Sequence, residues 1–325
     1  MQPMYLEAYS NGRLTKIVKK AFKKLESCSI CPRRCQVNRL KAEQGFCKTG
    51  LKVKVCSFML HHGEEPPISG EKGSGTIFFS HCNMNCVYCQ NYEFSQLVRG
   101  GREVDSQELA SFMMRLQEMG AHNINLVTPT HVMPQILQAL LIAIPQGLKI
   151  PLVYNTGGYE LAKIVKLLEG IIDIYLPDMR YADNDVAIKY SLAPDYPKYN
   201  QDSLKEMHRQ VGVAKINALG IIEKGLIIRH LILPNNISGT DKIMRFISRE
   251  LSKDTYISLM SQYFPCYKAD RFKEILRRIS QEEYHAAGQA MQRWGLHNGW
   301  IQEAHGLDRF AGIHIKPNLE QLDRK

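Results

Sequence analysis

The residues with the clearest chemical potential are three cysteines in the segment SHCNMNCVYCQN, namely Cys82, Cys86 and Cys89. A structural zinc site usually closes with four ligands and disulfides need pairs, so three thiols leave a site incomplete. Thiolates at positions i, i+4 and i+7 of one loop can wrap one face of a cubane iron–sulfur cluster and leave one iron without a protein ligand. A metal with an open position can bind and activate a small molecule.

Two other interpretations compete with a cluster at this loop. The cysteines can be buried core residues, but the polar side chains between them argue against a plain apolar turn. They can also form a zinc site with a fourth ligand from elsewhere, for example His81. The spacing favours the cluster with one open iron.

A second group of four cysteines has the pattern Cys28-x2-Cys31-x3-Cys35-x11-Cys47. Four thiolates can close a tetrahedral zinc site or bind a complete second iron–sulfur cluster, and the spacing leaves both metals open. The alternative is a set of uncoordinated thiols. We therefore expect a second metal site, zinc or iron–sulfur, in this segment.

The cysteine distribution also bears on the cellular compartment. Eight of the nine cysteines lie between Cys28 and Cys89, and only Cys266 stands apart. An odd count, in a chain of 325 residues without a signal-peptide pattern, favours reduced, metal-binding thiols over disulfides. A cytoplasmic protein is therefore predicted. No apolar run approaches the ~18 residues that a membrane span needs, so no membrane partner is expected.

The net charge of +10 admits an anionic partner such as nucleic acid. The basic residues are nevertheless spread in short runs, such as LVRGGR and FKEILRRIS, without the aromatic residues that nucleic-acid-binding motifs interleave. A solvated basic surface is the better interpretation, and a nucleic-acid partner is not expected.

The chain, 44% hydrophobic, can bury one large α/β domain with extensions, or two domains. Residues 1–27 have the spacing of one basic amphipathic helix, and residues 51–60 alternate as a strand does. Residues 61–75 contain two prolines and four glycines, which predicts a loop and a domain boundary. A helix is expected over residues 105–120, with Asp105 and Glu108 in capping-box positions, and a helical tail packs outside from Asp270 onward.

Between these parts, apolar runs alternate with helical patterns, which predicts a parallel sheet whose crossover helices cover both faces. The pattern alone fits a barrel and a doubly wound sheet equally well. The six runs cover residues 76–80, 123–130, 150–158, 171–178, 225–234 and 256–265.

Parallel strands place function at their carboxyl ends, so the polar residues there are the site candidates. These candidates are His81 and Cys82, Thr128 to His131 (with Thr130), Asn155 and Thr156, Asp178 and Arg180, Arg229 and His230, and Gln262 and Tyr263.

The pattern Cys82-x3-Cys86-x2-Cys89, with the aromatic Tyr88 before the last cysteine, resembles the motif of the radical S-adenosylmethionine (SAM) superfamily. The stretch GSGTIFFSHCNMNCVYCQN resembles the same region of pyruvate formate-lyase-activating enzymes. Stretches such as GAHNINLVTPTH, PLVYNTGGYE and DIYLPDMRY extend the likeness to the activating-enzyme-related branch, over most of residues 28–300.

The resemblance implies a radical SAM enzyme. Its three motif cysteines hold a [4Fe–4S] cluster whose open iron chelates SAM, and flavodoxin or ferredoxin supplies an electron. SAM is cleaved to methionine and a 5′-deoxyadenosyl radical, which abstracts hydrogen from a substrate, for example a glycyl-radical protein. The implied fold is an incomplete (β/α)6 TIM-like barrel at residues 73–265, after a basic helix and Cys-rich segment at residues 1–72 and before a C-terminal helical extension at residues 266–325.

The sequence departs from the family pattern at two places. The Gly-Gly-Glu that usually follows the second strand to hold SAM is replaced by TPTH, in which Thr130 and His131 offer only a hydroxyl and an imidazole. After the fourth strand the family's Asp-x-Lys is Asp178-Met179-Arg180, so a planar guanidinium replaces an ammonium. Asp178 can alternatively cap a helix. With Tyr88 and Asn155, these residues are the candidate SAM contacts.

Three alternatives stay open. The chain can direct radical chemistry at RNA or at a small molecule, or it can be a non-enzymatic, zinc-stabilised nucleic-acid-binding protein. The polar cluster of His61, His62, Glu64 and Glu65 is either a solvated loop or a source of a carboxylate near the active-site mouth. The substrate and the catalytic residues are not determined.

Overall fold

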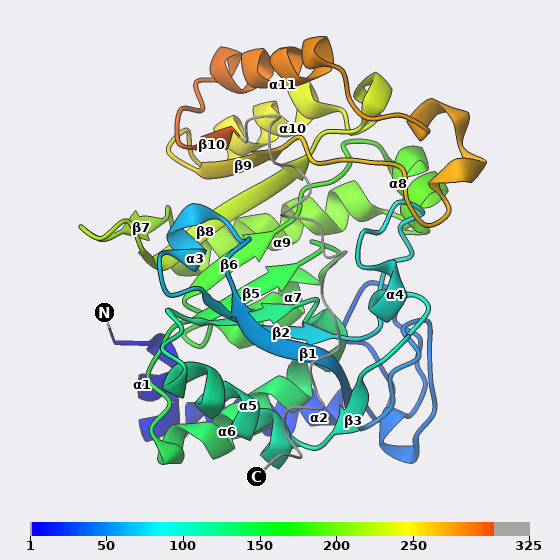
Figure 1. The fold of residues 1–325 in the computed structure, drawn as a ribbon. Coiled ribbons are helices and arrows are strands. Elements are labelled where there is room, and N and C mark those ends of the chain that lie inside the picture. Colours follow the sequence, from blue (N-terminus) through cyan, green and yellow to red (C-terminus); the bar gives the residue numbers. More distant parts are fainter. Residues whose placement is uncertain (1, 302–325) are drawn as a thin grey trace.

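The computed structural model describes residues 2–301, and its main feature is a sheet of ten strands (Figure 1). The strands are β1 (Val53–His61), β2 (Ser74–Phe79), β3 (Arg102–Val104), β4 (Ile124–Val127), β5 (Leu152–Thr156), β6 (Ile174–Pro177), β7 (Lys215–Ile216), β8 (Ile222–Leu231), β9 (Tyr256–Met260) and β10 (Gly299–Ile301).

The strand order is β10-β9-β8-β6-β5-β4-β2-β1-β3, with β7 beside β8. Neighbours from β2 to β10 are parallel, whereas β1 is antiparallel to both β2 and β3. The six predicted runs form β2, β4, β5, β6, β8 and β9, so the expected parallel series is confirmed.

The order of the parallel strands also bears on the choice between a barrel and a doubly wound sheet. These strands follow one another across the sheet in chain order, without the reversal that defines a doubly wound fold. Within the described residues the two end strands, β3 and β10, do not pair with each other. A mostly parallel α/β sheet of this kind is consistent with a partial TIM-like barrel.

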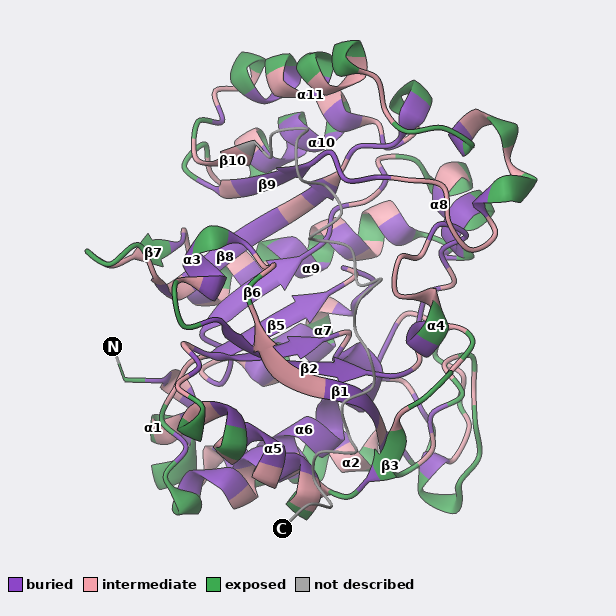
Figure 2. Cartoon of the chain, in the orientation of Figure 1, coloured by how far each residue is buried: buried purple, intermediate pink, exposed green. Residues whose placement is uncertain are grey.

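Helices cover the outer face of the sheet, and the parallel strands β2, β4, β5 and β6 are fully buried, whereas β3 and β7 are partly exposed (Figure 2). The helices are α1 (Met4–Ser10), α2 (Arg13–Lys23), α3 (Pro66–Ser69), α4 (Tyr92–Ser95), α5 (Ser106–Glu118), α6 (Met133–Ala143), α7 (Ala162–Val165), α8 (Asn184–Ser191), α9 (Tyr196–Val211), α10 (Thr240–Phe246) and α11 (Gln281–Arg293). Helices α5, α6, α7, α9 and α10 lie in the crossovers between successive parallel strands, as the alternating pattern predicted.

The predicted helix over residues 105–120 is α5, and its N-cap is the predicted one. Asp105 accepts a hydrogen bond from the backbone N–H of Glu108 at 2.9 Å, which satisfies an otherwise unpaired helix donor. Glu108 pairs with Arg102, so it forms an ion pair with the strand before the helix.

The inner face of the sheet has an apolar layer and then a polar layer along each strand. Val153, Leu176 and Ile227 of β5, β6 and β8 pack together with Ile68 of α3, in a cluster separate from the main core. Side chains alternate between the two faces of a strand, so the residue two positions on lies on the same inner face. Two positions after Val153 is Asn155, and two positions after Ile227 is Arg229. Both polar side chains therefore lie on the inner face of the sheet, near the carboxyl ends of their strands.

The N-terminal expectation of one helix over residues 1–27 is wrong. The segment forms α1 and α2, which are separated at Asn11 and Gly12, and Gly12 has a left-handed φ of 71°. Glycine takes this conformation without a steric cost and therefore ends the first helix. The strand expected at residues 51–60 is confirmed as β1.

The C-terminal helix begins later than expected. Short 3-10 turns occupy the stretch after Asp270, and α11 starts at Gln281, where Ser280 and Glu283 form a complete capping box. The described chain then adds β10 beside β9, a strand the helical extension did not predict. The rest of the predicted extension, residues 302–325, lies outside the described residues.

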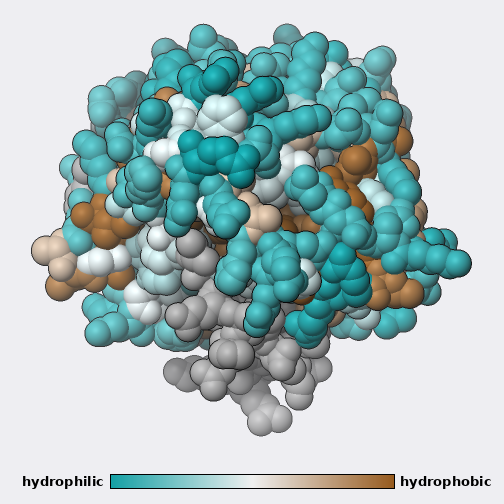
Figure 3. Space-filling view, turned by 90° about the horizontal axis from the view of Figure 1, so that it is seen from above, coloured by the Kyte–Doolittle hydropathy of each residue, from teal (hydrophilic) through white to brown (hydrophobic). Residues whose placement is uncertain are grey.

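On the face shown in Figure 3, hydrophilic side chains predominate and hydrophobic ones form small separate patches. Among the described residues, no helix is long and apolar enough to cross a membrane.

The predicted domain boundaries at residues 72/73 and 265/266 stay a prediction. Strands on both sides of each boundary belong to one sheet.

Candidate active site

The cysteine loop follows β2 directly and is held by hydrogen bonds from three other parts of the chain. Its first turn places His81 at a left-handed φ of 71°. The Asn83 side chain donates to the carbonyl of Tyr159 at 2.7 Å, and the backbone N–H of Val87 donates to the carbonyl of Tyr190 at 2.8 Å. The Arg33 Nε donates to the carbonyl of Asn83 at 2.9 Å. These contacts anchor the loop to distant parts of the chain.

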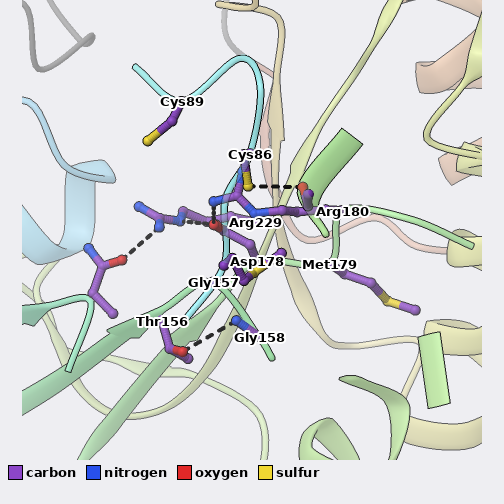
Figure 4. Close-up of polar contacts among 12 residues, drawn as sticks. Cys86, Cys89, Thr156, Gly157, Gly158, Asp178, Met179, Arg180 and Arg229 are labelled. Carbon is purple, nitrogen blue, oxygen red and sulfur yellow. Dashed lines mark hydrogen bonds and ion pairs between the residues drawn. The ribbon is translucent and has the colours of Figure 1, made fainter. Parts of the chain in front are cut away.

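Each of the three thiols in this loop has a polar neighbour. The backbone N–H of Met84 donates to Cys82 Sγ at 3.3 Å, and the Ser191 hydroxyl donates to Cys86 Sγ at 2.9 Å (Figure 4). Cys89 Sγ lies 3.2 Å from the Ser95 hydroxyl. Hydrogen bonds to sulfur stabilise the anionic thiolate, which is the form that binds metal.

Burial opposes ionisation of these thiols. It raises the pKa of the Cys89 thiol to about 11, and the neighbouring Cys86 adds to the rise, while Ser95 and the Arg180 guanidinium oppose it. Burial likewise raises the pKa of Cys82. The raised pKa values of Cys82 and Cys89 fit a site that a cationic metal centre completes, since the metal supplies the missing positive charge.

One cavity joins the three thiols to polar side chains from the ends of the parallel strands and from the loop after β1. Most of the candidate site residues contribute to this wall. The lining includes Glu64, Glu65, Cys82, Cys86, Tyr88, Cys89, Gln90, Thr128, Asn155, Gly157, Asp178, Arg180, Arg229 and Gln262.

A buried ion network forms one side of the cavity (Figure 4). Asp178, whose side chain is 6% exposed, pairs with Arg180 and with Arg229, the Arg229 Nε lying 2.8 Å from its Oδ1. Arg229 also donates to Asn155 Oδ1 at 2.6 Å and lies 3.6 Å from Glu64 Oε2. Asp178 is therefore an ion-pair partner in the site rather than a helix cap; Asp183 caps the next helix, α8.

The loop after β1 supplies carboxylates to the site. Of the two interpretations of this segment, a solvated loop or a source of a carboxylate near the active-site mouth, the second therefore holds. Glu64 lies against Arg229 and accepts from the Asn155 amide at 3.4 Å. Burial raises the pKa of Glu64, and it raises that of Glu65 to about 7, although Arg229 opposes both shifts. Several buried polar atoms here have no partner in the described chain, including Arg180 Nε, Gln262 Oε1 and Glu65 Oε2.

The glycine pair after β5 makes a turn against this network. Gly158 has a φ of +76°, and a Cβ at this position would lie 2.2 Å from the Asp178 carbonyl. Gly157 lines the cavity, and a Cβ there would lie 3.2 Å from the Met84 sulfur. Gly158 thus allows the tight turn, while the lack of a side chain at Gly157 leaves room for Met84 of the cysteine loop.

The structure does not bring Thr130 and His131 to this cavity. The Thr130 hydroxyl donates to Glu160, which also accepts from Thr156 at 2.6 Å, and burial raises the pKa of Glu160 to about 7. His131 is 1% exposed, bonds the Ser80 carbonyl through Nε2, and has its pKa lowered by burial to about 3. Of the TPTH segment, only Thr128 lines the cavity.

Three other rim residues have structural contacts. Tyr88 lines the cavity, but its hydroxyl bonds that of Tyr181. His230 is fully buried between the Met179 carbonyl and the Thr240 hydroxyl, and burial lowers its pKa to about 4, so it is a neutral structural histidine. The Tyr263 hydroxyl donates to the carbonyl of Ile275.

Comparison with known proteins identifies the family. A model described as the radical SAM superfamily matches residues 76–247, which include the cysteine loop and the ion network. The chain belongs to the radical SAM superfamily. It is 32% identical over 289 residues to "Uncharacterized protein MJ0674" of Methanocaldococcus jannaschii, covering 86% of this chain and 78% of that one.

Solved structures with similar folds include methylornithine synthase (PylB), with a TM-score of 0.47 and 14% identity over 74% of this chain and 69% of that one. The hydrogenase maturase HydG from Carboxydothermus hydrogenoformans gives a TM-score of 0.46 and 13% identity over 95% of this chain and 71% of that one.

Radical SAM enzymes use a [4Fe–4S] cluster and SAM, and the protein is an enzyme of this superfamily. The site fits these groups on two observations. The wall contains three thiols from one loop, with a polar donor beside each. It also contains the Arg180 Nε donor, which is buried without a partner and suits an anionic ligand.

Some radical SAM site residues were absent from the candidate SAM contacts predicted from the sequence. Arg229 and Gln262 carried a signal, because each lies near the carboxyl end of a predicted strand. Ser191 and Ser95 carried none, because each reaches its cysteine only through the folded chain, and Ser191 lies 105 positions from Cys86.

Proposed function

We propose that this radical SAM enzyme holds its cluster with Cys82, Cys86 and Cys89 and binds SAM against the Asp178–Arg180–Arg229 network. The observation that carries the proposal is that three thiols of one loop and the unpartnered Arg180 Nε line the same cavity. When bound, the cluster and SAM supply a 5′-deoxyadenosyl radical that abstracts hydrogen from the substrate.

The residues around the thiols have a preparatory role. The Met84 N–H and the Ser191 and Ser95 hydroxyls stabilise the three sulfurs as anions. The buried walls also exclude water, which protects a reactive radical from side reactions.

The ion network is suited to the amino-acid part of SAM, which carries one positive and one negative group. Arg180 offers a free donor to the carboxylate, and Asp178 offers an acceptor to the ammonium. Asn155 and Gln262 line the same cavity and can hydrogen-bond the polar edge of the nucleoside. This set takes the place of Thr130 and His131 among the proposed SAM contacts.

We infer that the substrate is a polypeptide segment of a glycyl-radical protein. The resemblance of GSGTIFFSHCNMNCVYCQN to activating enzymes supports this assignment. Within the described residues β3 and β10 do not pair, so the sheet is not closed there, which is compatible with a protein segment as substrate. Flavodoxin or ferredoxin is the proposed electron donor, and the cytoplasm the proposed compartment.

The cluster assignment is tested by anaerobic reconstitution with iron and sulfide, followed by dithionite reduction in the presence of SAM. Wild-type protein should form 5′-deoxyadenosine, and Cys86→Ala should lose both this product and the cluster iron bound by the loop. The matched control is Cys56→Ala, a buried cysteine of β1 that does not line the cavity. Unchanged product formation in Cys86→Ala would refute the assignment.

The substrate assignment needs a separate test. The reduced enzyme is mixed with SAM and pyruvate formate-lyase, and the glycyl radical is sought by electron paramagnetic resonance. A radical signal that depends on Cys86 supports activation of a glycyl-radical protein. If 5′-deoxyadenosine forms but no protein radical appears, radical SAM chemistry stands and this substrate does not.

A further inference from the structure

The four N-terminal cysteines, which the proposed function does not use, come together in the folded chain. Cys28, Cys31, Cys35 and Cys47 line one cavity, separate from the active-site cavity. The turn that joins them is tight: the backbone N–H of Gln36 donates to the Cys28 carbonyl at 3.0 Å. We propose that these four thiols hold a second iron–sulfur cluster.

The close approach of the backbone at residues 45–46 to the Cys35 sulfur depends on a glycine. A Cβ at Gly45 would lie 2.7 Å from the Cys35 sulfur, closer than any side chain allows. The next residue, Phe46, donates its backbone N–H to the same sulfur at 3.4 Å. The chain is therefore built to bring backbone up to a thiol, as ligand loops of metal–thiolate centres do.

Two buried polar atoms at this cavity have no hydrogen-bond partner within the described residues. Arg39 is 1% exposed; its Nε and Nη2 donate to the Gly50 carbonyl, and its Nη1 has no partner. His131 also lines the cavity; its Nε2 bonds the Ser80 carbonyl, which leaves Nδ1 unpartnered. A buried guanidinium with an unused donor calls for an anionic occupant, and a cluster with four thiolate ligands is anionic.

The arrangement of the thiols favours a cluster over a single ion. Within the described residues, no three Cys, His, Asp or Glu side chains converge closely enough to hold one metal ion. The same is true of Cys82, Cys86 and Cys89, although the family places a polynuclear cluster in this enzyme. The N-terminal thiols therefore share this lack of single-ion convergence with the loop that holds the family's cluster, which supports a cluster there as well.

Arg33 connects this cavity to the active-site loop. It lines the N-terminal cavity, its Nε donates to the Asn83 carbonyl at 2.9 Å, and its guanidinium lies 3.6 Å from the centre of the Phe46 ring. One half-buried cation thus contacts the loops that carry both sets of thiols.

The experiment separates the two sites by mutation of the full-length chain. A triple variant, Cys82→Ala with Cys86→Ala and Cys89→Ala, removes the active-site thiols. After anaerobic reconstitution it should retain about four iron and four sulfide per chain, half of the roughly eight in wild type, with a [4Fe–4S] signal after reduction. A triple variant without iron, or with zinc and no sulfide, would overturn the proposal.

The reciprocal variant replaces all four N-terminal thiols, Cys28→Ser with Cys31→Ser, Cys35→Ser and Cys47→Ser, and keeps the active-site cysteines. All four are replaced because three thiols can already hold a cluster. This quadruple variant should lose the iron of the N-terminal site and keep the iron of the active-site loop. Cys56→Ser is the matched control and should keep both. Circular dichroism establishes that each variant is folded, so iron retained at the wild-type level in the folded quadruple variant also contradicts the proposal. Because iron content is measured, failure here is distinct from failure of the proposed function.

Discussion

Arg229 of β8 and Asp178 at the end of β6 face each other across two neighbouring strands, with Arg229 Nε 2.8 Å from Asp178 Oδ1. The strands are joined at this point by a bridge between the same two residues. The ion pair is therefore fixed by backbone pairing, and it holds Arg180 and Glu64 in place on either side.

Asp178→Asn should destabilise the protein, because it leaves two buried guanidinium groups without their shared counter-ion. The expected loss in free energy of unfolding is about 3 kcal/mol, measured by urea denaturation. Asp241→Asn breaks an exposed pair with Arg293 and should cost less than about 1 kcal/mol. Equal losses in the two variants would contradict a structural role for the buried pair.

Arg180→Lys should weaken SAM binding while the fold is kept. Lysine retains the charge but lacks the Nε donor that is unpartnered in the cavity. We expect the Kd for SAM, measured by calorimetry on anaerobically reconstituted protein, to rise about tenfold. Arg209→Lys, at an exposed pair with Glu206, serves as the control and should leave the Kd unchanged. An unchanged Kd in Arg180→Lys would exclude this contact.

Ser191→Ala should alter the cluster without removing it. The mutation deletes the hydroxyl that donates to Cys86 Sγ, and hydrogen bonds to sulfur ligands raise cluster potentials. The reduction potential should fall by an amount on the order of tens of mV, as measured by redox titration. Ser203→Ala, which removes a buried hydroxyl bonded to the Asn200 carbonyl, should leave the potential unchanged.

Glu160 should make stability depend on pH. Burial raises its pKa from 4.5 to about 7 in the folded protein, so the folded state binds a proton more tightly than the unfolded state. Its contribution is present at low pH and is lost as the pH rises from 4.5 to about 7. In Glu160→Gln, urea titrations at several pH values should show a shallower decline over this range. Exposed Glu118→Gln should keep the wild-type slope.

Gly158→Ala should destabilise the turn beside Asp178. The added Cβ would lie 2.2 Å from the Asp178 carbonyl at a left-handed φ, so backbone must move. The loss should exceed about 2 kcal/mol in the free energy of unfolding. Gly12→Ala has a similar φ of +71°, in the left-handed helical region, with nothing near the added atom, and should cost only about 1 kcal/mol, from backbone strain alone. Similar losses would remove the argument for close packing at Gly158.

The sequence by itself determined the parallel strands and the cysteine loop. Both follow from local properties: runs such as 150–158 are apolar and bounded by turn residues, and Cys82, Cys86 and Cys89 share one short segment. The single helix predicted over residues 1–27 was wrong, although Asn11-Gly12 is a local turn signal within the helical pattern.

Only the tertiary structure decided which polar side chains meet. Glu64 precedes the first parallel strand, yet it contacts Arg229, because the loop after β1 reaches the inner face of the sheet. His131 lies in a segment next to the expected SAM site but faces the N-terminal cysteines. Such contacts join residues far apart in the chain, and their side-chain directions depend on strand register and loop packing, which no local pattern records.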